Sequence, residues 1–379
     1  MRILLVGEFS RLHNSLKEGL IANGHEVLLV SNGDGFKNYP NDLSTRAIFC
    51  SSSFGSLVKK ILFRLFAFDL MKLEHGIRFY FHVPQLKNFD VVQFINESAI
   101  QTQPIFERYL VGKLVSNNKK CFLLCCGPDY MVAQYLVARK ERYSIMNPYF
   151  EKEESKKEYR FIFDFLTNKH LKLHDFMYQH TCGVIATDLD YHLPLKDHEH
   201  YLGMIPNPIN TLKNEYTSNS IDGKINIFLG INRSTYFTKG ISFFEEALKI
   251  IKEKYADLVD ITITENVPYN EYIEKYTACH ILLDQVYGYD QGYNALEAMA
   301  KGKVVFTGAE QEVDAYYNLD EKVAVNALPS VDQIVAELSK LIENPAEIQA
   351  IGLRARQFIE KYHNHVTIAS NYLEVWNSN

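Results

Sequence analysis

The stretch RILLVGEFSRLHNSLKEGLIANGHEVLLVS, residues 2–31, decides the fold class of the chain. Residues 2–6 and 25–31 are rich in apolar side chains, which is typical of strands buried on both faces of a parallel sheet. Between them, residues 14–24 place apolar side chains at helical spacing and end at Gly24. The stretch therefore predicts a strand, a helix and a second strand parallel to the first.

Two series of such units follow one another along the chain. Further strands are predicted at 89–95, 120–127 and 182–188 in the first series, and at 224–230, 259–265, 280–286 and 303–308 in the second. The segment between the series, residues 191–210, holds three prolines and few apolar residues, as domain boundaries do. We therefore predict an α/β fold of two doubly wound domains, 1–200 and 201–361, with a C-terminal helix at about 362–379 that packs back on the first domain. The carboxyl ends of both sheets are then expected to face one central cleft.

Composition excludes several classes of protein. The 379 residues carry a net charge of −6 at neutral pH, which argues against a nucleic-acid binder that works by neutralising phosphates. The chain begins directly with an expected strand, and no apolar run approaches the length of a membrane span, so we expect no signal peptide and no transmembrane helix. Six cysteines without repeated spacing fit a cytoplasmic protein.

The stretch GINRSTYFTKG, residues 230–240, predicts an anion site. A strand ends at Gly230, the following loop carries Arg233 and Lys239, and a helix opens at Gly240. Two cations beside the positive end of a helix favour a phosphate group. The alternative is that the two side chains are solvated surface cations.

The stretch YGYDQGYNALEAMAKGKVVF, residues 287–306, predicts a second ligand contact. Gly292 lets the backbone approach a ligand, and the first N–H groups of the helix that follows face the same cleft. Glu297 leans toward the start of that helix, where its carboxylate would bind sugar or ribose hydroxyls. Alternatively, Asn294 is the N-cap and Glu297 completes a capping box with it.

The stretch ENVPYNEYIEKY, residues 265–276, is a weaker candidate. Its loop around Asn266, Val267 and Tyr269 follows an expected strand, so it lies where it would flank a flat nucleobase. An aromatic wall or an ordinary loop fits this sequence equally well.

These motifs together resemble those of retaining GT-B glycosyltransferases, and of glycosyltransferase family 4 in particular. The six-residue spacing of Arg233 and Lys239 resembles the diphosphate motif of that family, and GYNALEAMAKGKVVF resembles its donor-binding signature. IPNPIN at 205–210 and GVIATDLDYHLPL at 183–195 resemble the linker and the segment before it. The resemblance implies the GT-B fold, in which two Rossmann-like domains face a central cleft. It also implies a nucleotide-diphosphate sugar as donor, a glycan or lipid-linked acceptor, retention at the anomeric carbon, and no metal or separate cofactor. Such enzymes serve the biosynthesis of cell-surface polysaccharides and glycoconjugates.

The resemblance also assigns roles to individual residues. It implies that Arg233, Lys239 and Glu297 are catalytic. The donor-binding set that it implies comprises Gly230, Asn266, Val267, Tyr269, Tyr289, Asp290, Gly292, Tyr293 and Asn294. Tyr289 stands where the family has a glutamate, so either the neighbouring Asp290 takes over its donor-sugar contact or the donor sugar differs.

The acceptor is expected on the first domain. Gly7, Ser10 and His13 lie in or near the loop after the first strand, and Asp129 lies at the end of another strand, so each is a candidate polar contact at the cleft. A surface or helix-capping role is the alternative for His13.

The stretch SLVKKILFRLFAFDLMK, residues 56–72, carries four basic residues and one acidic residue, a net charge of +3. It is either a helix packed on the first sheet or a basic amphipathic helix that holds the protein at the inner face of a membrane.

Two other functions also remain open. One is a catalytically silent module that binds nucleotide or glycan, favoured by Tyr289 in place of the glutamate. The other is a sugar-nucleotide epimerase, although its carboxylates are not evident in the sequence.

Overall fold

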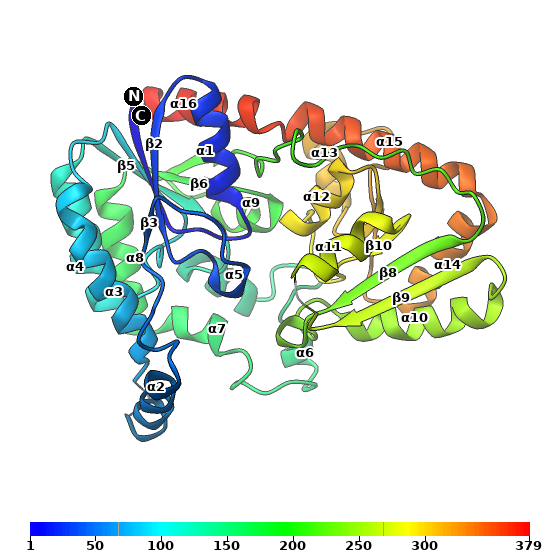
Figure 1. Cartoon of the computed structure of the whole chain (residues 1–379), viewed down its shortest axis with the longest axis horizontal. Helices are drawn as coiled ribbons and strands as arrows, with labels where there is room; N and C mark the ends of the chain where they lie inside the picture. Colours follow the sequence, from blue (N-terminus) through cyan, green and yellow to red (C-terminus); the bar gives the residue numbers. More distant parts are fainter. Residues whose placement is uncertain (67, 268) are drawn as a thin grey trace.

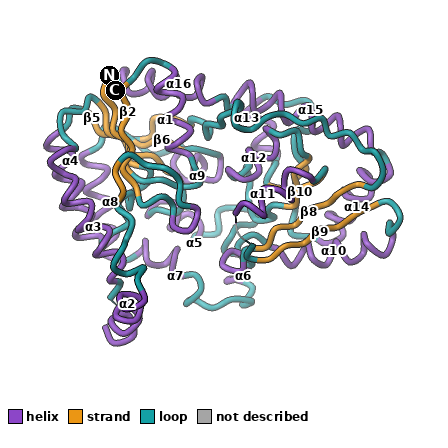
Figure 2. Tube along the Cα trace, in the orientation of Figure 1, coloured by secondary structure: helices purple, strands orange, loops and turns teal. Residues whose placement is uncertain are grey.

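The computed structural model describes residues 1–66, 68–267 and 269–379, and of Phe36, Tyr269 and Asn270 it describes the backbone alone. Two parallel sheets lie side by side, each flanked by helices (Figures 1 and 2). The chain therefore has the α/β architecture that its alternating sequence predicts.

The first sheet has seven strands in the order β3-β2-β1-β4-β5-β6-β7. Their bounds are β1 Arg2–Val6, β2 Glu26–Ser31, β3 Leu43–Ser44, β4 Val91–Phe94, β5 Lys120–Cys125, β6 Val184–Ala186 and β7 Tyr201–Met204. The central strand β1 is almost completely buried, which explains why its sequence is apolar without alternation. Since β7 pairs with β6, the first sheet extends to Met204, beyond the expected boundary at residue 200.

The second sheet has five strands in the order β12-β11-β10-β8-β9. Their bounds are β8 Ile225–Ile231, β9 Val259–Glu265, β10 Ile281–Leu283, β11 Val304–Thr307 and β12 Val325–Asn326. All their pairings are parallel, so the carboxyl ends of these strands lie at one edge of the sheet. The loops after β8, β9 and β10 therefore meet at that edge.

The helices connect these strands and cover the sheets. Those of the first half are α1 Leu12–Ala22, α2 Ser53–Phe66, α3 Leu70–His82, α4 Pro104–Asn117, α5 Tyr130–Val137, α6 Asn147–Phe150, α7 Arg160–Phe163, α8 Asn168–His180 and α9 Leu189–Leu195. Those of the second half are α10 Ile241–Lys254, α11 Tyr269–Ala278, α12 Tyr293–Ala300, α13 Gln311–Tyr317, α14 Val331–Glu343, α15 Pro345–Tyr362 and α16 His365–Ser378. Short 3-10 turns occur at Gly35–Lys37, Val83–Gln85, Asp164–Leu166 and Arg233–Thr235.

The last helix, α16, returns to the first half, where it lies beside α1 (Figure 1). The indole Nε1 of Trp376 donates a hydrogen bond to Gln93 Oε1 at 3.0 Å, and both side chains are buried. The amide of Asn23 donates to the carbonyl of Val366 at 3.1 Å. These contacts join the end of the chain to the first sheet and its first helix.

Two aspartates join the two halves of the chain. The N–H of Tyr289 donates to Asp190 Oδ1 at 2.9 Å, and the N–H of Leu189 donates to Asp290 Oδ2 at 3.0 Å. Burial raises the pKa of Asp190 to about 7 and that of Asp290 to about 6. Arg142 adds an ion pair with Glu312 at 2.8 Å across the same junction. The relative position of the two halves is therefore fixed by specific polar contacts.

Candidate functional site

A cavity of about 630 Å³ lies between the two halves at the carboxyl edge of the second sheet. The first half contributes Ser10, Lys37 and Tyr39 to its wall. The second half contributes Gly230, Ile231, Asn232, Thr235, Lys239, Thr264, Asn266, Val267, Tyr272, Asp284, Gln285, Gly292, Tyr293, Asn294 and Glu297. A cavity of this size, with many polar groups converging on it, is what a polar small-molecule ligand requires.

Lys239 places a positive charge in this cavity. Its Nζ lies 2.8 Å from Asp284 Oδ1, and about a third of the lysine side chain is exposed, whereas the aspartate side chain is buried. The loop reaches this position because Gly240 adopts a φ of +64°, and a Cβ there would lie 2.9 Å from the Cβ of Val286. Lys239 is therefore partly exposed in the cavity, while its ammonium group is paired with the buried carboxylate of Asp284.

The N-terminus of α12 faces the same cavity through Gly292, Tyr293 and Asn294. Gly292 is the N-cap residue, so the alternative in which Asn294 caps the helix and pairs with Glu297 in a capping box is not what the structure has. The side-chain amide of Asn294 instead donates to Asp284 Oδ1 at 2.8 Å and accepts from the hydroxyl of Tyr272 at 3.0 Å. The first N–H groups of α12 and the Lys239 ammonium thus lie around one cavity, an arrangement that favours an anion.

Glu297 of α12 also lines the cavity, as Asp284 does. Burial raises the pKa of its carboxyl group, while the positive charges of Arg11, Lys301 and Lys37 oppose that rise. A carboxylate in this position accepts hydrogen bonds from ligand hydroxyls, because it has lone pairs and no competing donor.

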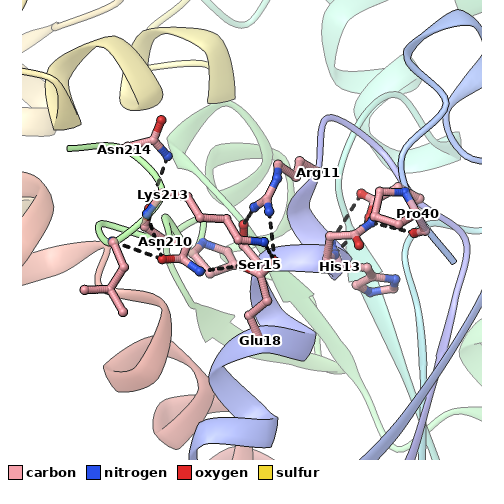
Figure 3. Close-up of polar contacts among 12 residues, drawn as sticks. Arg11, His13, Ser15, Glu18, Pro40, Asn210, Lys213 and Asn214 are labelled. Carbon is pink, nitrogen blue, oxygen red and sulfur yellow. Dashed lines mark hydrogen bonds and ion pairs between the residues drawn. The ribbon is translucent and has the colours of Figure 1, made fainter.

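Helix α1 supports this region from the first half (Figure 3). Arg11 donates to Ser15 Oγ and to Glu18 Oε1, both at 2.8 Å, and Lys213 and Asn210 of the linker also bind Glu18, both at 2.6 Å. These contacts connect α1 to the segment that precedes the second sheet.

A further contact joins α1 to α12. The hydroxyl of Tyr293 lies 2.6 Å from Ser15 Oγ and donates to the carbonyl of Pro208 at 2.9 Å. The start of α12, and with it the wall that carries Glu297, is therefore held by both halves.

The ends of β8 and β9 form the remaining wall. A Cβ on Gly230 would collide with the ring of Tyr272, so the glycine allows that ring to lie over the end of β8. Asn266 adopts a φ of +48° and accepts a hydrogen bond from the N–H of Arg233 at 3.1 Å, while its neighbour Val267 lines the cavity. The side chain of Tyr269 lies outside the described part of the structure, and α11 begins at that residue.

Arg233 differs from the expectation. Its guanidinium group pairs with Glu265 Oε2 at 2.6 Å and lies 4.8 Å from the ring centre of Tyr236, and the residue is not part of the cavity wall, although Asn232 and Thr235 on either side are. The ion pair forms because β8 and β9 pair in register up to Ile231 and Glu265, which brings the Glu265 carboxylate next to the loop that carries Arg233. The hydrogen bond from Arg233 lowers the pKa of Glu265.

Tyr289 and Asp290 also lie outside the cavity wall. The hydroxyl of Tyr289 accepts a hydrogen bond from the N–H of Arg142 at 2.8 Å, and its ring packs 5.4 Å from that of Tyr143. Asp290 accepts from the N–H groups of Leu189 and Gln291. Both residues belong to the junction between the halves.

Of the acceptor-side candidates, Ser10 lines the cavity and the other three are buried away from it. His13 Nδ1 lies 2.8 Å from the carbonyl of Gly7, and burial lowers the pKa of His13 to about 3. Gly7 adopts a φ of +88°, and a Cβ there would collide with Ile95. Asp129 caps α5 by accepting from the N–H of Val132 at 2.8 Å, and burial raises its pKa to about 7.

Several cavity residues were not predicted from the sequence. Asp284 had a signal, because it directly follows the apolar strand β10 and so lies at the carboxyl edge of the sheet. Lys37 and Tyr39 had none, since they lie at the end of a short 3-10 turn and in the loop after it. Across the described residues, no cluster of three or more histidine, cysteine or acidic side chains could hold a metal ion, and no helix is long and apolar enough to cross a membrane.

Comparison with known proteins supports the fold. Residues 240–374 match a family model described as glycosyl transferase-like, while no curated protein matches the chain. The structure is similar to sucrose-phosphate synthase from Thermosynechococcus elongatus, with a TM-score of 0.61 at 15% identity over 100% of this chain and 98% of the other. It is also similar to HepE from Anabaena in complex with UDP and glucose, with a TM-score of 0.59 at 12% identity over 100% and 99%. HepE has also been solved with UDP-glucose. The chain therefore has the GT-B fold, and its residues 240–374 are similar to the glycosyl transferase-like family.

Proposed function

We propose that the protein is a cytoplasmic glycosyltransferase of the family 4 type. It transfers a sugar from a nucleoside-diphosphate sugar to a glycan or lipid-linked acceptor, with retention and without a metal ion, in the synthesis of a cell-surface polysaccharide or glycoconjugate. The observation that carries this proposal is the single cavity in which an accessible lysine, a helix N-terminus and a carboxylate lie together. The complexes of HepE with UDP, glucose and UDP-glucose support a donor of the same chemical class.

The donor is proposed to lie along the wall formed by the second half. Its diphosphate binds Lys239 and the first N–H groups of α12, and its ribose hydroxyls bind the carboxylate of Glu297. The base lies against the loop that carries Asn266 and Val267. The sugar then points toward the side of the cavity that the first half contributes, where the acceptor binds.

The reaction breaks the bond between the anomeric carbon and the β-phosphate oxygen, and forms a bond from that carbon to an acceptor oxygen. Negative charge develops on the departing phosphate, where Lys239 and the start of α12 stabilise it more strongly than they stabilise the ground state. The departing phosphate takes the acceptor's proton on the same face of the sugar. Arg233 contributes when its guanidinium group exchanges Glu265 for the diphosphate, which its exposed side chain and its place in the loop between the cavity residues Asn232 and Thr235 allow.

A catalytically silent nucleotide-binding module is the second candidate. Two observations favour it: Arg233 is paired with Glu265, and Tyr289, which replaces the family's glutamate, is buried in the junction between the halves. Such a module would bind nucleotide without turning over a nucleotide sugar, and that outcome separates it from the enzyme.

Two measurements in sequence test the proposal. Thermal unfolding is first followed with UDP, GDP and ADP, because a ligand that binds the native state raises the apparent stability. Release of the matching diphosphate from its nucleotide sugars is then measured with and without EDTA, and the anomeric configuration of any product is read by NMR. Lys249→Ala, which replaces an exposed lysine near the far end of α10, is the matched control for Lys239→Ala.

The proposed enzyme is supported if a nucleotide binds and its sugar is turned over in the presence of EDTA. Turnover should also fall in Lys239→Ala and stay unchanged in the control. Binding with no turnover, even as slow hydrolysis, supports the silent module. Interconversion of the sugar with no acceptor present supports an epimerase. The absence of any nucleotide binding contradicts all three functions.

A further inference from the structure

Helix α2 extends away from the body of the first half (Figure 1), and many of its apolar side chains are exposed, Phe63 and Phe66 among them. Phe54, Leu57, Ile61 and Leu65 follow one another at spacings of three and four residues, so they lie along one side of the helix. Their side chains are 69%, 57%, 47% and 66% exposed. We call these four residues the α2 face. An uncovered apolar stripe of this length marks a surface that binds something apolar.

The turn before α2 extends this surface. Ile48 and Phe49 are also exposed, and the rings of Phe49 and Phe54 meet edge to face at 6.3 Å between centres. The turn is held rigidly, because Glu74 accepts hydrogen bonds from the N–H groups of Ile48, Phe49 and Cys50 at 2.6, 2.7 and 2.8 Å. The α2 face is thus presented by an ordered structure.

Basic side chains border the α2 face. Lys60 follows Leu57 by three residues, and Arg64 follows Ile61 by three. Both basic side chains are exposed and four residues apart, so they form a row along the helix beside the α2 face. In the described part of the chain no carboxylate lies within ion-pair distance of either cation. The nearby carboxylate of Asp69 accepts hydrogen bonds from the backbone of α3, just as Glu74 binds the turn. The exposed charge here is therefore positive, although the whole chain carries −6.

We infer that the α2 face docks on an anionic phospholipid bilayer. An apolar stripe bordered by lysine and arginine lies parallel to such a surface, with the apolar side chains at the acyl boundary and the cations at the headgroups. Its 14 residues are fewer than the roughly 20 that a membrane-spanning helix needs, so the helix would lie in the interface. This inference does not depend on the proposed transfer reaction.

The charge pattern also argues against a second copy of the chain as the occupant. Two α2 faces packed antiparallel about a two-fold axis would bring the rows of Lys60 and Arg64 of both copies to the same edge of the contact. Like charges brought together in this way oppose association, whereas anionic headgroups neutralise them.

The test is cosedimentation of the intact protein with vesicles. One set is made of phosphatidylcholine alone, and the other contains phosphatidylglycerol as well. The wild type is expected to bind the second set, to bind the first far more weakly, and to dissociate as salt is added. Each basic residue near an anionic surface contributes about fivefold to partitioning, so Lys60→Glu with Arg64→Glu is expected to reduce binding by at least 30-fold, by an order-of-magnitude estimate.

A second variant removes the apolar contribution while keeping the charges. Leu57→Ser with Ile61→Ser is expected to reduce binding on the order of tenfold. The matched control is Lys249→Glu, Ile250→Ser and Lys252→Glu on α10, where all three side chains are exposed, and it is expected to bind as the wild type does. All the substitutions in the two test variants are at surface or partly exposed positions, and circular dichroism checks that each variant is folded.

Each of the following results would overturn the inference. The first is absence of vesicle binding by the wild type. The second is equal binding to neutral and anionic vesicles, or an equal loss in the α10 control. The third is a concentration-dependent dimer of the wild type, seen by light scattering, that Leu57→Ser with Ile61→Ser dissolves. That outcome would assign the α2 face to self-association.

Discussion

Replacing Lys239 with alanine tests whether this side chain meets the charge of a departing phosphate. Lys239 lines the cavity together with the first residues of α12, and about a third of its side chain is exposed. The loss of one such group costs about 2–4 kcal/mol in transition-state stabilisation. Since each 1.36 kcal/mol is a factor of ten, kcat/KM is expected to fall roughly 30- to 1,000-fold.

The same substitution also affects stability, and the two effects can be separated. Asp284 is 3% exposed and would keep its hydrogen bond from Asn294 but lose its cation. Removing one partner of a fully buried pair costs about 3–5 kcal/mol, and because Lys239 is one-third exposed we expect about 1–2 kcal/mol in the free energy of unfolding. Lys239→Met with Asp284→Asn removes both charges, so it should regain most of the stability while remaining inactive.

Urea unfolding and steady-state release of the nucleoside diphosphate measure these two quantities on the same preparations. Lys249→Ala on α10 serves as the control for a lost surface lysine. A kcat/KM within about threefold of wild type for Lys239→Ala would show that the ammonium group has no catalytic role. Recovery of activity together with stability in the double variant would show that its role is only to neutralise Asp284.

Further predictions concern the binding carboxylate, two buried titratable groups and the C-terminal helix. Glu297→Gln should weaken binding of the nucleoside diphosphate by about 1–3 kcal/mol, measured by calorimetry, and an unchanged affinity would remove its proposed ribose contact. The pKa of Asp290 is raised to about 6 against an unfolded value of about 3.9, so the native state holds a proton that the unfolded state loses, and stability falls as pH rises through that window. Asp290→Asn should remove the contribution of this group to the fall, on the order of 3 kcal/mol in urea titrations. Parallel pH profiles of variant and wild type would contradict it. The pKa of His13 is lowered to about 3 in the folded state, against about 6.5 in the unfolded state, so stability is lost as pH falls below about 6.5. His13→Asn should therefore flatten the stability profile below that pH. An unchanged loss of stability in acid would show that another group causes it. Trp376→Ala should lower the free energy of unfolding by about 3–5 kcal/mol, because its indole is buried against the first sheet. Leu353 is exposed, so Leu353→Ala should cost little. Equal losses in the two variants would contradict this packing.

The fold could be predicted because its signals are local. Unbroken apolar runs mark the strands of both sheets, and the helices between them follow from apolar spacing and closing glycines. The same local logic placed Gly230, Lys239, Gly292 and Glu297 at the ends of strands or the start of a helix, and the structure brings all four to one cavity. Parallel pairing explains this, because it aligns the carboxyl ends of β8 and β10.

The remaining features depend on contacts that no local pattern encodes. Arg233 is held by Glu265 because of the register between β8 and β9, a long-range property of the sheet. Tyr289 and Asp290 lie close in sequence to Gly292 of the cavity wall, but they contact the first half instead. The N–H of Tyr289 donates to Asp190, and the carboxylate of Asp290 accepts from the N–H of Leu189. Residues such as these can be placed only when the packing of the two halves is known.

The first half was the harder part to predict for the same reason. His13 is expected at a surface or a cleft from its sequence, yet it lies on the buried side of α1, where its ring is bonded to the carbonyl of Gly7. Lys37 and Tyr39 line the cavity from a loop whose length and composition carry no periodic signal. The stretch 56–72 forms two helices, and the part in α2 is uncovered on its apolar side, which the sequence left open.

Calorimetric titration of the intact protein with UDP, GDP and ADP tests most directly whether the cavity is a nucleoside-diphosphate site. We expect saturable binding of at least one of the three with one ligand per chain. We expect that affinity to fall on the order of tenfold in both Lys239→Ala and Glu297→Gln, and to be unchanged in Lys249→Ala. Absence of binding by all three nucleotides, or an affinity that neither Lys239→Ala nor Glu297→Gln alters, would contradict the assignment of this cavity.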